Sequence, residues 1–507
     1  MEVVENLKME ISYLISFTSV EIAENFKSLY SKKFVFNNGV LYHYNGIYWA
    51  KDDKNFSILN KFIGIEYFNY LFNIFQEYDK KADKKEFKQV LIIRKNIEKL
   101  RNYSQRQNYL NEIINFITNN EIIWNSKPEL FCFNNKLYNL DKNKFVNSKP
   151  RYYINMTCGY DYNDGYDNKN IIELTNLLEK IHSNIDIRNC YLETISTGLY
   201  GQNLEKFIIA SGSGGNGKGV INELLCQTLG NYSYVLNNNV LFQNMKQGSN
   251  PEIANCNDKR MVIIREPDEK QTLNASIIKE LTGGSEINAR MNHSNDTKTN
   301  LKLTLLMECN EKPNISEVND AIQRRIIDIP FNSIFTSQDK IDKLKKDNIE
   351  LTNIFKADRY FKTDEFKNQY KQALFMVLIK HFKIFRDNNF NIKIPEIINV
   401  RTQEYMQNSD AFYNVIEENY KKTDSIKDIV PLKEIYNIFK GSEIYINSTK
   451  DQKRKMNYKN FIEKIKTNIF FRSYLKQNNK DTYILTNYIL NETKLENDSD
   501  DNKIYDF

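Results

Sequence analysis

Apolar residues in the middle of the chain occur in short continuous runs, separated by longer segments in which they recur at helical spacing. The run Phe207–Ala210 is continuous and predicts a buried strand. Segment 220–229 instead predicts a helix that ends at Gly230, where glycine can form an αL cap. The alternation of strands and helices continues from about residue 171 to 335 and predicts an α/β core. The apolar residues that share one face of the predicted helix are Ile221, Leu224, Leu225 and Leu229.

The first 170 residues have a different pattern, in which aromatic-rich strands accompany charged helices. Segment Phe34–Trp49 predicts a hairpin, because Asn38-Gly39 and Asn45-Gly46 are turn signals between alternating apolar residues. A second hairpin is expected within Phe131–Leu140, and charged helical segments fill residues 50–120. This pattern predicts an α+β domain over residues 1–170.

Beyond residue 340 the chain becomes rich in lysine and largely helical. It contains a helical segment at 397–420, a basic cluster at 450–456 and a Tyr-rich strand pair near 470–490. Helices followed by a strand pair are compatible with a winged-helix-like fold in this region. The predicted domains are residues 1–170, the α/β core 171–338, a mostly helical domain 339–490 and a polar, acidic tail 491–507 that we expect to be disordered.

Length and composition agree with a mostly folded chain of several domains. With 507 residues it suits roughly three domains by the usual length prior. Its 41% hydrophobic residues can form substantial cores, and 8 prolines argue against long disordered linkers. The formal net charge of +6 is compatible with a polyanionic partner, but it is equally compatible with an ordinary surface.

Cysteine and histidine usage excludes the common sulfur-bound metal sites. The six cysteines are widely separated without a C-x-x-C pair, and only four histidines accompany them. We therefore expect reduced, mostly buried thiols in an intracellular protein, without a zinc ribbon or an iron–sulfur cluster. No apolar run is long enough to cross a bilayer, and an N-terminus with Glu2, Glu5 and Glu10 lacks the layout of a signal peptide.

A glycine-rich loop follows the predicted strand 207–210 and precedes the predicted helix 220–229. Glycines allow backbone N–H groups to turn towards phosphate oxygens, and the lysine of this loop reaches the outer phosphates. The loop therefore predicts a nucleoside-triphosphate cradle, although a surface loop can match such a motif by chance. The position after the lysine is glycine where Ser or Thr normally contacts Mg²⁺, so a metal would depend on phosphates, water and carboxylates elsewhere. The loop residues are Gly212, Ser213, Gly214, Gly215, Asn216, Gly217, Lys218 and Gly219.

Polar residues that suit triphosphate hydrolysis follow the later strands. Glu266 comes directly after the apolar run 261–265, where a carboxylate can hold Mg²⁺ and polarise water, with Asp268 or Glu269 in support. An acidic turn without function is the alternative. Asn310 follows the next strand and can orient water near the γ-phosphate.

Two adjacent arginines, Arg324 and Arg325, precede the last short strand of the core. In a ring of identical subunits such an arginine can enter the neighbouring site and stabilise the charge on the transferred phosphoryl group. A structural salt bridge or a nucleic-acid contact is the alternative for either residue.

The order of these motifs resembles the superfamily 3 helicases, and more closely the helicase half of the primase-helicases of large nucleocytoplasmic DNA viruses, of poxvirus type, and of phages and plasmids. The resemblance covers roughly residues 30–340. Besides the glycine loop, it rests on Glu266-Pro267, Leu281-Thr-Gly-Gly284, Ala289-Arg290, Asn310 and Arg324-Arg325, and upstream on Tyr42-His-Tyr-Asn-Gly-Ile-Tyr-Trp49, Phe133-Asn-Asn-Lys-Leu-Tyr-Asn-Leu140 and Thr157-Cys-Gly-Tyr160.

This resemblance implies an AAA+-type P-loop ATPase that binds ATP and Mg²⁺, assembles as a homo-hexamer and threads single-stranded or forked DNA through a basic channel. A DNA-contacting hairpin of that family corresponds to residues 284–302 here, and Lys298 is the first candidate within it. A solvated hairpin tip without function is the alternative. The candidate DNA contacts are Arg290, His293, Lys298 and Lys302.

We therefore expect an ATP-dependent replicative DNA helicase of viral or mobile-element type. Because the family-like segment begins near residue 42, the chain is expected to lack a primase domain and to work with a separate primase and other replication proteins. It is expected in the cytoplasm, in a viral factory, or in the host cytosol or nucleus, and not in a membrane or outside the cell. The alternatives are an ATP-driven DNA-binding or packaging protein without strand separation, and an assembly protein that binds nucleotide without hydrolysis, which Gly219 keeps open.

Overall fold

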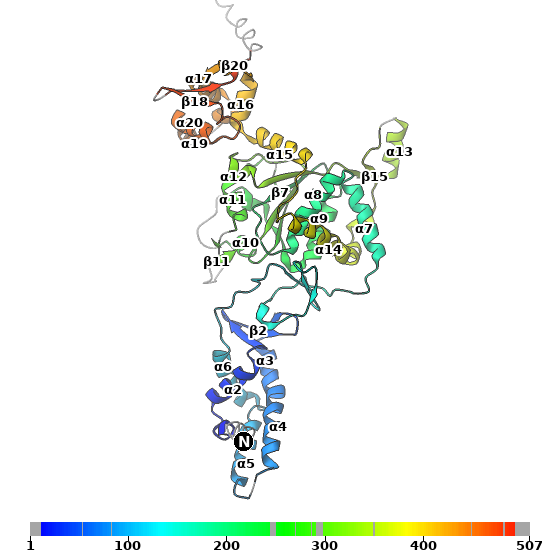
Figure 1. Cartoon of the computed structure of the whole chain (residues 1–507), viewed down its shortest axis with the longest axis vertical. Helices are drawn as coiled ribbons and strands as arrows, with labels where there is room; N and C mark the ends of the chain where they lie inside the picture. The colour runs from blue at the N-terminus through cyan, green and yellow to red at the C-terminus, as the bar shows by residue number, and fades with distance from the viewer. Residues whose placement is uncertain are drawn as a thin grey trace, which may run out of the picture. The chain divides into compact units, whose positions relative to one another are not determined.

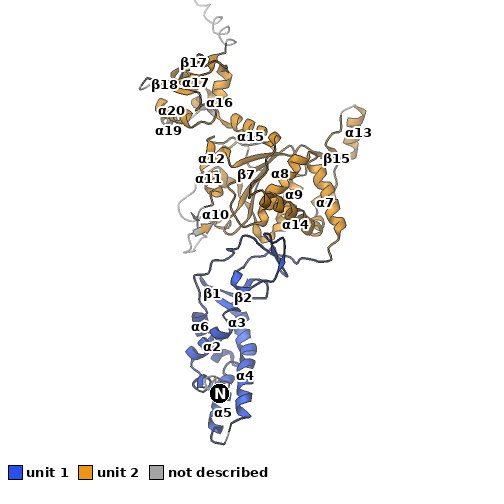
Figure 2. Ribbon diagram, in the orientation of Figure 1, with its two compact units in different colours: residues 1–164 blue, residues 165–507 orange. Residues whose placement is uncertain are grey.

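The computed structural model describes residues 12–52, 54–82, 84–243, 250–268, 270–284, 286–289, 298–347, 350–447, 449–479 and 482–491 (Figure 1). Internal contacts divide the chain into two compact units, Met1–Asp164 and Gly165–Phe507 (Figure 2). The predicted disordered tail lies outside the described residues except for Asn491.

Unit 1 combines helices with two small antiparallel sheets, of strand order β1-β2-β3 and β4-β5-β6. Both predicted hairpins are therefore confirmed, and each gains a third strand. The predicted helices within 50–120 are also present. The elements are α2 (Ser19–Tyr30), β1 (Phe34–Asn37), β2 (Val40–Tyr44), β3 (Trp49–Lys51), α3 (Ser57–Phe62), η1 (Ile63–Tyr67), α4 (Phe68–Asp79), α5 (Phe87–Glu98), α6 (Tyr103–Phe116), β4 (Leu130–Cys132), β5 (Leu137–Asn139), β6 (Lys144–Val146) and η2 (Pro150–Tyr152).

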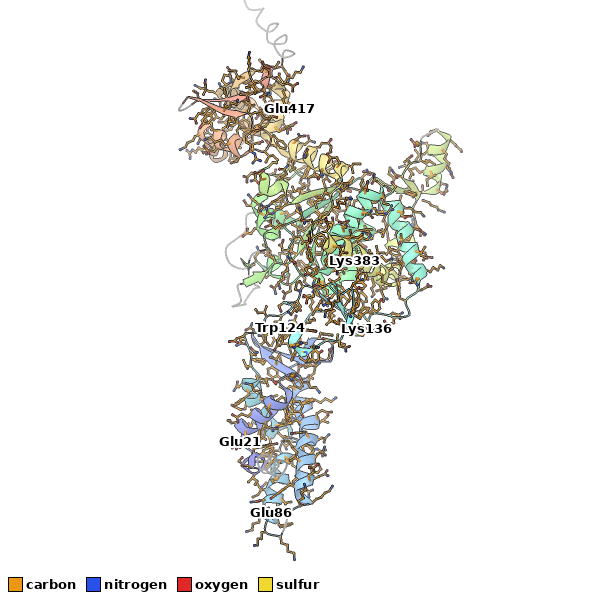
Figure 3. The ribbon with its side chains drawn as sticks, in the orientation of Figure 1. Glu21, Glu86, Trp124, Lys136, Lys383 and Glu417 are labelled. Carbon is orange, nitrogen blue, oxygen red and sulfur yellow. The ribbon has the colours of Figure 1, made fainter. Side chains whose placement is uncertain are left out.

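Aromatic side chains hold the core of unit 1. Trp124, labelled in Figure 3, packs on Tyr42 with ring centroids 4.5 Å apart and donates its indole N–H to the side-chain oxygen of Asn37. Helices α3 and α4 join through η1, a single stretch of π-helix. π-Helical turns are rare in proteins, and those that occur are frequently at functional sites.

The core of unit 2 is a five-stranded parallel sheet of order β13-β7-β12-β9-β8, so the prediction of an α/β core with a buried sheet is confirmed. The elements of this part are α7 (Asn168–Ile181), α8 (Ile185–Ser196), η3 (Thr197–Leu199), β7 (Phe207–Ser211), α9 (Lys218–Leu229), η4 (Gly230–Tyr232), β8 (Ser233–Leu236), η5 (Asn238–Leu241), α10 (Pro251–Ala254), β9 (Met261–Arg265), α11 (Ala275–Thr282), β10 (Glu286–Asn288), β11 (Lys298–Asn300), β12 (Thr304–Cys309), α12 (Asp320–Gln323), β13 (Ile326–Pro330), β14 (Ile334–Thr336), α13 (Gln338–Lys346), β15 (Ile354–Lys356), η6 (Arg359–Lys362), α14 (Asp364–Asp387) and α15 (Glu396–Ser409).

Helices cover both faces of the sheet, which is why most residues of its strands are buried and apolar (Figure 1). Phe207 and Ile209 of β7 join a core with residues of α11 and α15. Successive strand residues point to opposite faces, so Ile208 and Ala210 face the other layer. That layer contains α8, α9 and α14, and α14 packs against α7, α8 and α9. The cover of the sheet therefore includes helices from beyond residue 338.

The last part of unit 2 has its own apolar core beneath two small sheets, β17-β19-β18 and β16-β20. The predicted strand pair near 470–490 is confirmed as β18 and β19, which pair antiparallel. The elements are α16 (Ala411–Asn419), β16 (Tyr420–Lys422), β17 (Ile429–Pro431), α17 (Leu432–Gly441), α18 (Glu443–Ile446), α19 (Lys450–Lys455), α20 (Tyr458–Thr467), β18 (Leu475–Asn479), β19 (Thr482–Thr486) and β20 (Tyr488–Leu490).

One local prediction is wrong in its geometry. Helix α9 does end at Gly230, but this residue has φ 52° and ψ −123° rather than αL angles. The chain continues from it into the short 3-10 turn η4, which directs it into β8. All six cysteines are free, as expected, and five of them are buried. Within the described part of the chain, no helix has the length and apolar character needed to cross a membrane.

Candidate nucleotide site

The glycine-rich loop lies between the C-terminal end of β7 and the first residue of α9, as the sequence predicts. Two of its glycines are required by close approach. A Cβ atom on Gly212 would lie 2.5 Å from the Asn216 amide nitrogen, and one on Gly217 would lie 2.8 Å from Ile181. Gly217 also has φ 85° at the N-cap of α9, a conformation that favours glycine. The loop is therefore tightly folded and specified by its sequence.

Lys218, the first residue of α9, turns its ammonium back over the loop. Its Nζ donates to the backbone oxygens of Gly212 at 2.8 Å and Cys309 at 2.9 Å, and to the side-chain oxygen of Asn310 at 3.2 Å. The residue is buried. Burial lowers the pKa of the ammonium from its usual value, while the nearby carboxylates of Glu308 and Glu266 act in the opposite direction. Lys218 and Asn310, which the sequence analysis selected separately, therefore lie within hydrogen-bond distance of each other.

Gly219 occupies the position where a hydroxyl is usual in such loops. Nothing lies within 4 Å of a Cβ placed there, and its backbone is part of helix α9. The missing hydroxyl is thus not a consequence of crowding by the protein.

A cavity of about 110 Å³ opens beside the loop. Gly215, Gly217 and Val220 form its loop side, and Asp358 and Lys362 contribute the charged groups. Sequence reasoning missed this cavity, because its walls come from segments separated by well over a hundred positions. Its apolar walls are Leu177 and Ile181 of α7, Phe335 of β14, Ala357 and Phe361.

Glu266 follows β9, and its backbone N–H donates to the backbone carbonyl oxygen of Glu308 at 3.0 Å. Its side chain is exposed, and it has φ 44°, a left-handed conformation that is costly outside glycine. Asp268 is differently placed: its carboxylate accepts from the Lys270 N–H and the Gln271 amide and so fixes the turn. Glu269 lies outside the described residues.

No group of three or more metal-ligating side chains gathers in the described part of the chain. The protein residues near the loop therefore fit a magnesium ion only if phosphate and water oxygens supply most of its ligands, as the absence of a hydroxyl at Gly219 indicates.

Sequence reasoning also missed Glu308, a buried carboxylate on β12 just before Cys309. Its Oε1 forms an ion pair with Arg265, 3.0 Å from the guanidinium Nε, and its Oε2 accepts from the Asn222 amide at 3.1 Å. Burial raises the pKa of this carboxyl above its usual range, and these two partners oppose the effect. The Asn222 oxygen in turn accepts from the hydroxyl of Tyr191. This network connects α9 with strands β9 and β12. Its one signal in the sequence is the charged residue Glu308 near the end of an apolar strand.

Arg324 and Arg325 precede β13, which runs parallel to β7, so they lie at the N-terminal ends of the strands, whereas the glycine loop lies at the C-terminal ends. The two ends of a five-residue strand are about 16 Å apart. Arg325 is buried and donates to Thr282 at 3.0 Å and to the Ala321 oxygen at 2.7 Å. Arg324 is exposed and pairs with Glu205 at 3.3 Å. Neither residue reaches the loop of its own chain.

The hairpin predicted within 284–302 is present as the antiparallel strands β10 and β11. Lys298 is the first residue of β11, while Arg290 and His293 lie outside the described residues. The half-buried Lys302 forms an ion pair within the protein, because its Nζ lies 3.8 Å from Oδ1 of Asp258.

Comparisons with known proteins agree with the resemblance. Residues 23–183 match the family "D5 N terminal like", and residues 210–325 match a family of unknown function, DUF5906. A protein of Acanthamoeba polyphaga mimivirus with the name "Putative helicase L207/L206" is 26% identical over 82% of this chain and 44% of its own length. "Primase D5" of Fowlpox virus is 27% identical over 53% of this chain and 36% of its own length.

The chain thus spans less than half of the length of these two relatives. Among solved structures, the C-terminal region of NrS-1 is 14% identical and covers 76% of this chain and 90% of its own, with a TM-score of 0.40. The family match over 23–183 and the similarity to helicase- and primase-named viral proteins confirm the resemblance: this chain is similar to the D5-type primase-helicases of large DNA viruses.

Proposed function

We propose that this chain is an ATP-dependent replicative DNA helicase of viral or mobile-element type, built on an AAA+-type P-loop ATPase core. The observation that carries the proposal is the position of Lys218. Its ammonium lies over a tightly folded glycine loop with only neutral oxygens as hydrogen-bond partners. Phosphate oxygens would bind this ammonium more strongly than neutral carbonyls do, because the negative charge of a phosphate adds Coulombic attraction to the hydrogen bond.

The residues around the loop fit ATP. Backbone N–H groups of residues 212–219 would surround the phosphates, and the N-terminus of the twelve-residue helix α9 favours negative charge. The apolar cavity lies directly beside Gly215 and Gly217 and would receive the base. Lys218 would contact the outer phosphates.

Hydrolysis would use the polar residues that follow β9 and β12. A Mg²⁺ ion bound to the phosphates would neutralise charge that develops during phosphoryl transfer. Glu266 is the exposed carboxylate of this edge and would orient and deprotonate the attacking water. Asp268 would support the ion mainly by fixing the turn after Glu266. The side-chain amide of Asn310, whose oxygen accepts from Lys218, would lie between this lysine and the attacking water.

The position of Arg324 favours a ring. It is exposed and lies at the sheet edge remote from its own glycine loop, so it would complete the site of a neighbouring subunit, in a homo-hexamer. Arg325 would hold the Arg324 segment in place through its buried hydrogen bonds.

Single-stranded or forked DNA is the proposed nucleic-acid partner. The hairpin β10–β11 would contact its backbone through Lys298, with Arg290, His293 and Lys302 as further candidates. The last part of unit 2, with helices α17 and α20 beside the strands β18 and β19, would be a winged-helix-like domain. A primase would act together with the helicase. The words helicase and primase in the names of the mimivirus and fowlpox relatives support a role in DNA replication.

Unwinding of a forked duplex by the purified chain, with ATP and Mg²⁺, tests the proposal. Strand separation that is lost in Lys218→Ala supports it. DNA-stimulated phosphate release without strand separation would instead indicate an ATP-driven DNA-binding or packaging protein. Gly219 favours a second candidate, an assembly protein that binds nucleotide without hydrolysing it, and this protein would form rings with ATP but release no phosphate.

A further inference from the structure

Unit 1 contains a second cavity, of about 540 Å³, which the nucleotide site does not use. Its walls come from helix α3 and the segment before it, from the π-helical turn η1, and from the first turn of α6 with the segment that precedes it. Four of its lining residues are cations: Lys54, Lys61, Arg101 and Arg106.

No carboxylate lines this cavity among the described residues. Within the same described part of the chain, none of the four cations forms an ion pair. Like charges that converge in one concavity raise its positive potential, since the low-dielectric walls focus the field. A cavity of this kind attracts anions, and its size accommodates a phosphate group with its neighbours in a polymer.

The two arginines are held in place before any ligand binds. Arg106 donates to the side-chain oxygen of Asn60 at 2.5 Å and to the Leu100 carbonyl at 2.8 Å. The Arg101 guanidinium lies over the Phe68 ring, 4.4 Å from its centroid. Because these contacts already restrict the side chains, binding an anion would cost less conformational entropy.

The π-helical turn makes room for Arg106. Gly64 lies in this turn, and a Cβ atom there would collide with the Arg106 guanidinium. A side chain at position 64 would therefore displace the Arg106 guanidinium from its place along the cavity wall. Tyr103 adds a different kind of group: its ring lines the same cavity and is 65% exposed.

We propose that this cavity binds the phosphodiester backbone of single-stranded nucleic acid, with Lys54, Lys61, Arg101 and Arg106 at the phosphates and Tyr103 stacked on a base. Cationic grooves with exposed aromatic rings are the usual means of binding single strands. A free phosphate ion would use the cations but not the ring, and a duplex would offer no unstacked base to Tyr103. The proposal does not depend on ATP hydrolysis.

Fluorescence anisotropy of the full chain with a labelled oligothymidine, without nucleotide and at several salt concentrations, tests the proposal. For Lys61→Gln/Arg101→Gln we expect binding about tenfold weaker or more, and a salt slope smaller by about 1.4, since each lost phosphate contact contributes about 0.7. For Tyr103→Ala we expect binding at least about fivefold weaker with an unchanged salt slope, and for Tyr103→Phe near-normal binding.

Lys27→Gln/Lys88→Gln is the matched control, because it removes the same charge from exposed positions of unit 1 that do not line the cavity. An oligonucleotide carrying a photoreactive thymidine analogue should crosslink within residues 99–106. Equal affinities of the cavity and control variants, or crosslinks only elsewhere, would overturn the proposal. So would displacement of the oligonucleotide by inorganic phosphate at constant ionic strength, or tighter binding of a matched duplex.

Discussion

The ammonium of Lys218 lies 3.2 Å from the side-chain oxygen of Asn310, although the two residues are 92 positions apart in the chain. They meet because β7 and β12 are neighbouring parallel strands, whose C-terminal ends reach the same edge of the sheet. The glycine loop starts from one strand end and Asn310 from the other. We expect the phosphate oxygens of a bound nucleotide to replace Asn310 and the two backbone carbonyls as partners of this ammonium.

Gly219 gives a prediction about the magnesium ion. Nothing lies within 4 Å of a Cβ at this helical position, so Gly219→Ser and Gly219→Ala should both fold and be more stable by about 0.5–1 kcal/mol. Only serine adds a hydroxyl that can contact the metal. Gly219→Ser should therefore lower the Mg²⁺ concentration needed for half-maximal phosphate release, and Gly219→Ala should leave it unchanged. The same shift in both variants would mean that the hydroxyl is not responsible.

Glu266 and Asp268 should behave differently when their charges are removed. Glu266→Gln should retain ATP binding but lower phosphate release by about a hundredfold or more, because the base that deprotonates water is lost. Asp268→Asn weakens the turn, because the Asp268 carboxylate accepts from Lys270 and Gln271. It should cost about 0.5–1.5 kcal/mol of stability, with a smaller loss of turnover than Glu266→Gln. Phosphate release and thermal unfolding of both variants check this contrast. Retained turnover in Glu266→Gln would contradict the proposed base.

The adjacent arginines should separate into a functional and a structural residue. Arg324→Ala should fold normally and lose about a thousandfold or more in ATP turnover, whereas Arg325→Ala should lose about 1–3 kcal/mol of stability with its buried hydrogen bonds. Mixing Arg324→Ala with Lys218→Ala should restore part of the activity in hybrid rings, because some interfaces then contain both wild-type residues. Mixed rings without any recovered activity would argue against a role between subunits.

His182 should make stability depend on pH. Burial lowers the pKa of its imidazole to about 3, with Arg188 adding to the effect. The unfolded chain binds a proton near pH 6.5 and the folded chain does not, so the contribution of His182 is complete above that pH and is lost as the pH falls. From about pH 7.5 to about pH 5.5 it should destabilise the protein by about 1.4 kcal/mol.

His182→Phe should remove this pH-dependent loss at little cost, since the ring packs on Phe331 and its Nε2 has no hydrogen-bond partner within the described residues. Urea unfolding at the two pH values measures the difference. His381, whose pKa burial lowers to about 4, supplies a similar loss that should persist in the variant. An unchanged pH dependence in His182→Phe would show that His182 is not the titrating group.

Local signals in the sequence were sufficient to predict the glycine loop and the strands around it. Residues 207–210 form a continuous apolar run because both faces of the sheet are covered, and Gly212, Gly215 and Gly217 of the loop have close contacts and positive φ values that favour glycine. The polar residues after β9 and β12 were also found, since the carboxyl ends of parallel strands meet at one edge.

Features that depend on distant segments were not predictable in this way. Glu308 owes its importance to Arg265 and Asn222, which reach it only through the sheet register and helix packing. The cavity beside the loop combines α7 with residues after β15. Arg324 and Arg325 are identical in type and adjacent in sequence, yet Arg324 is exposed and Arg325 is buried, where it donates to Thr282 and to the Ala321 carbonyl.

Phosphate release with Mg²⁺ and ATP, compared between the wild-type chain and Lys218→Ala, tests most directly whether this loop clasps a triphosphate that the chain hydrolyses. Lys218 makes its hydrogen bonds with neutral oxygens, so its removal should leave the fold intact, as thermal unfolding can verify. We predict steady release by the wild-type chain that rises with single-stranded DNA and falls at least about a hundredfold in Lys218→Ala. Equal release by the two proteins would contradict the proposed motor.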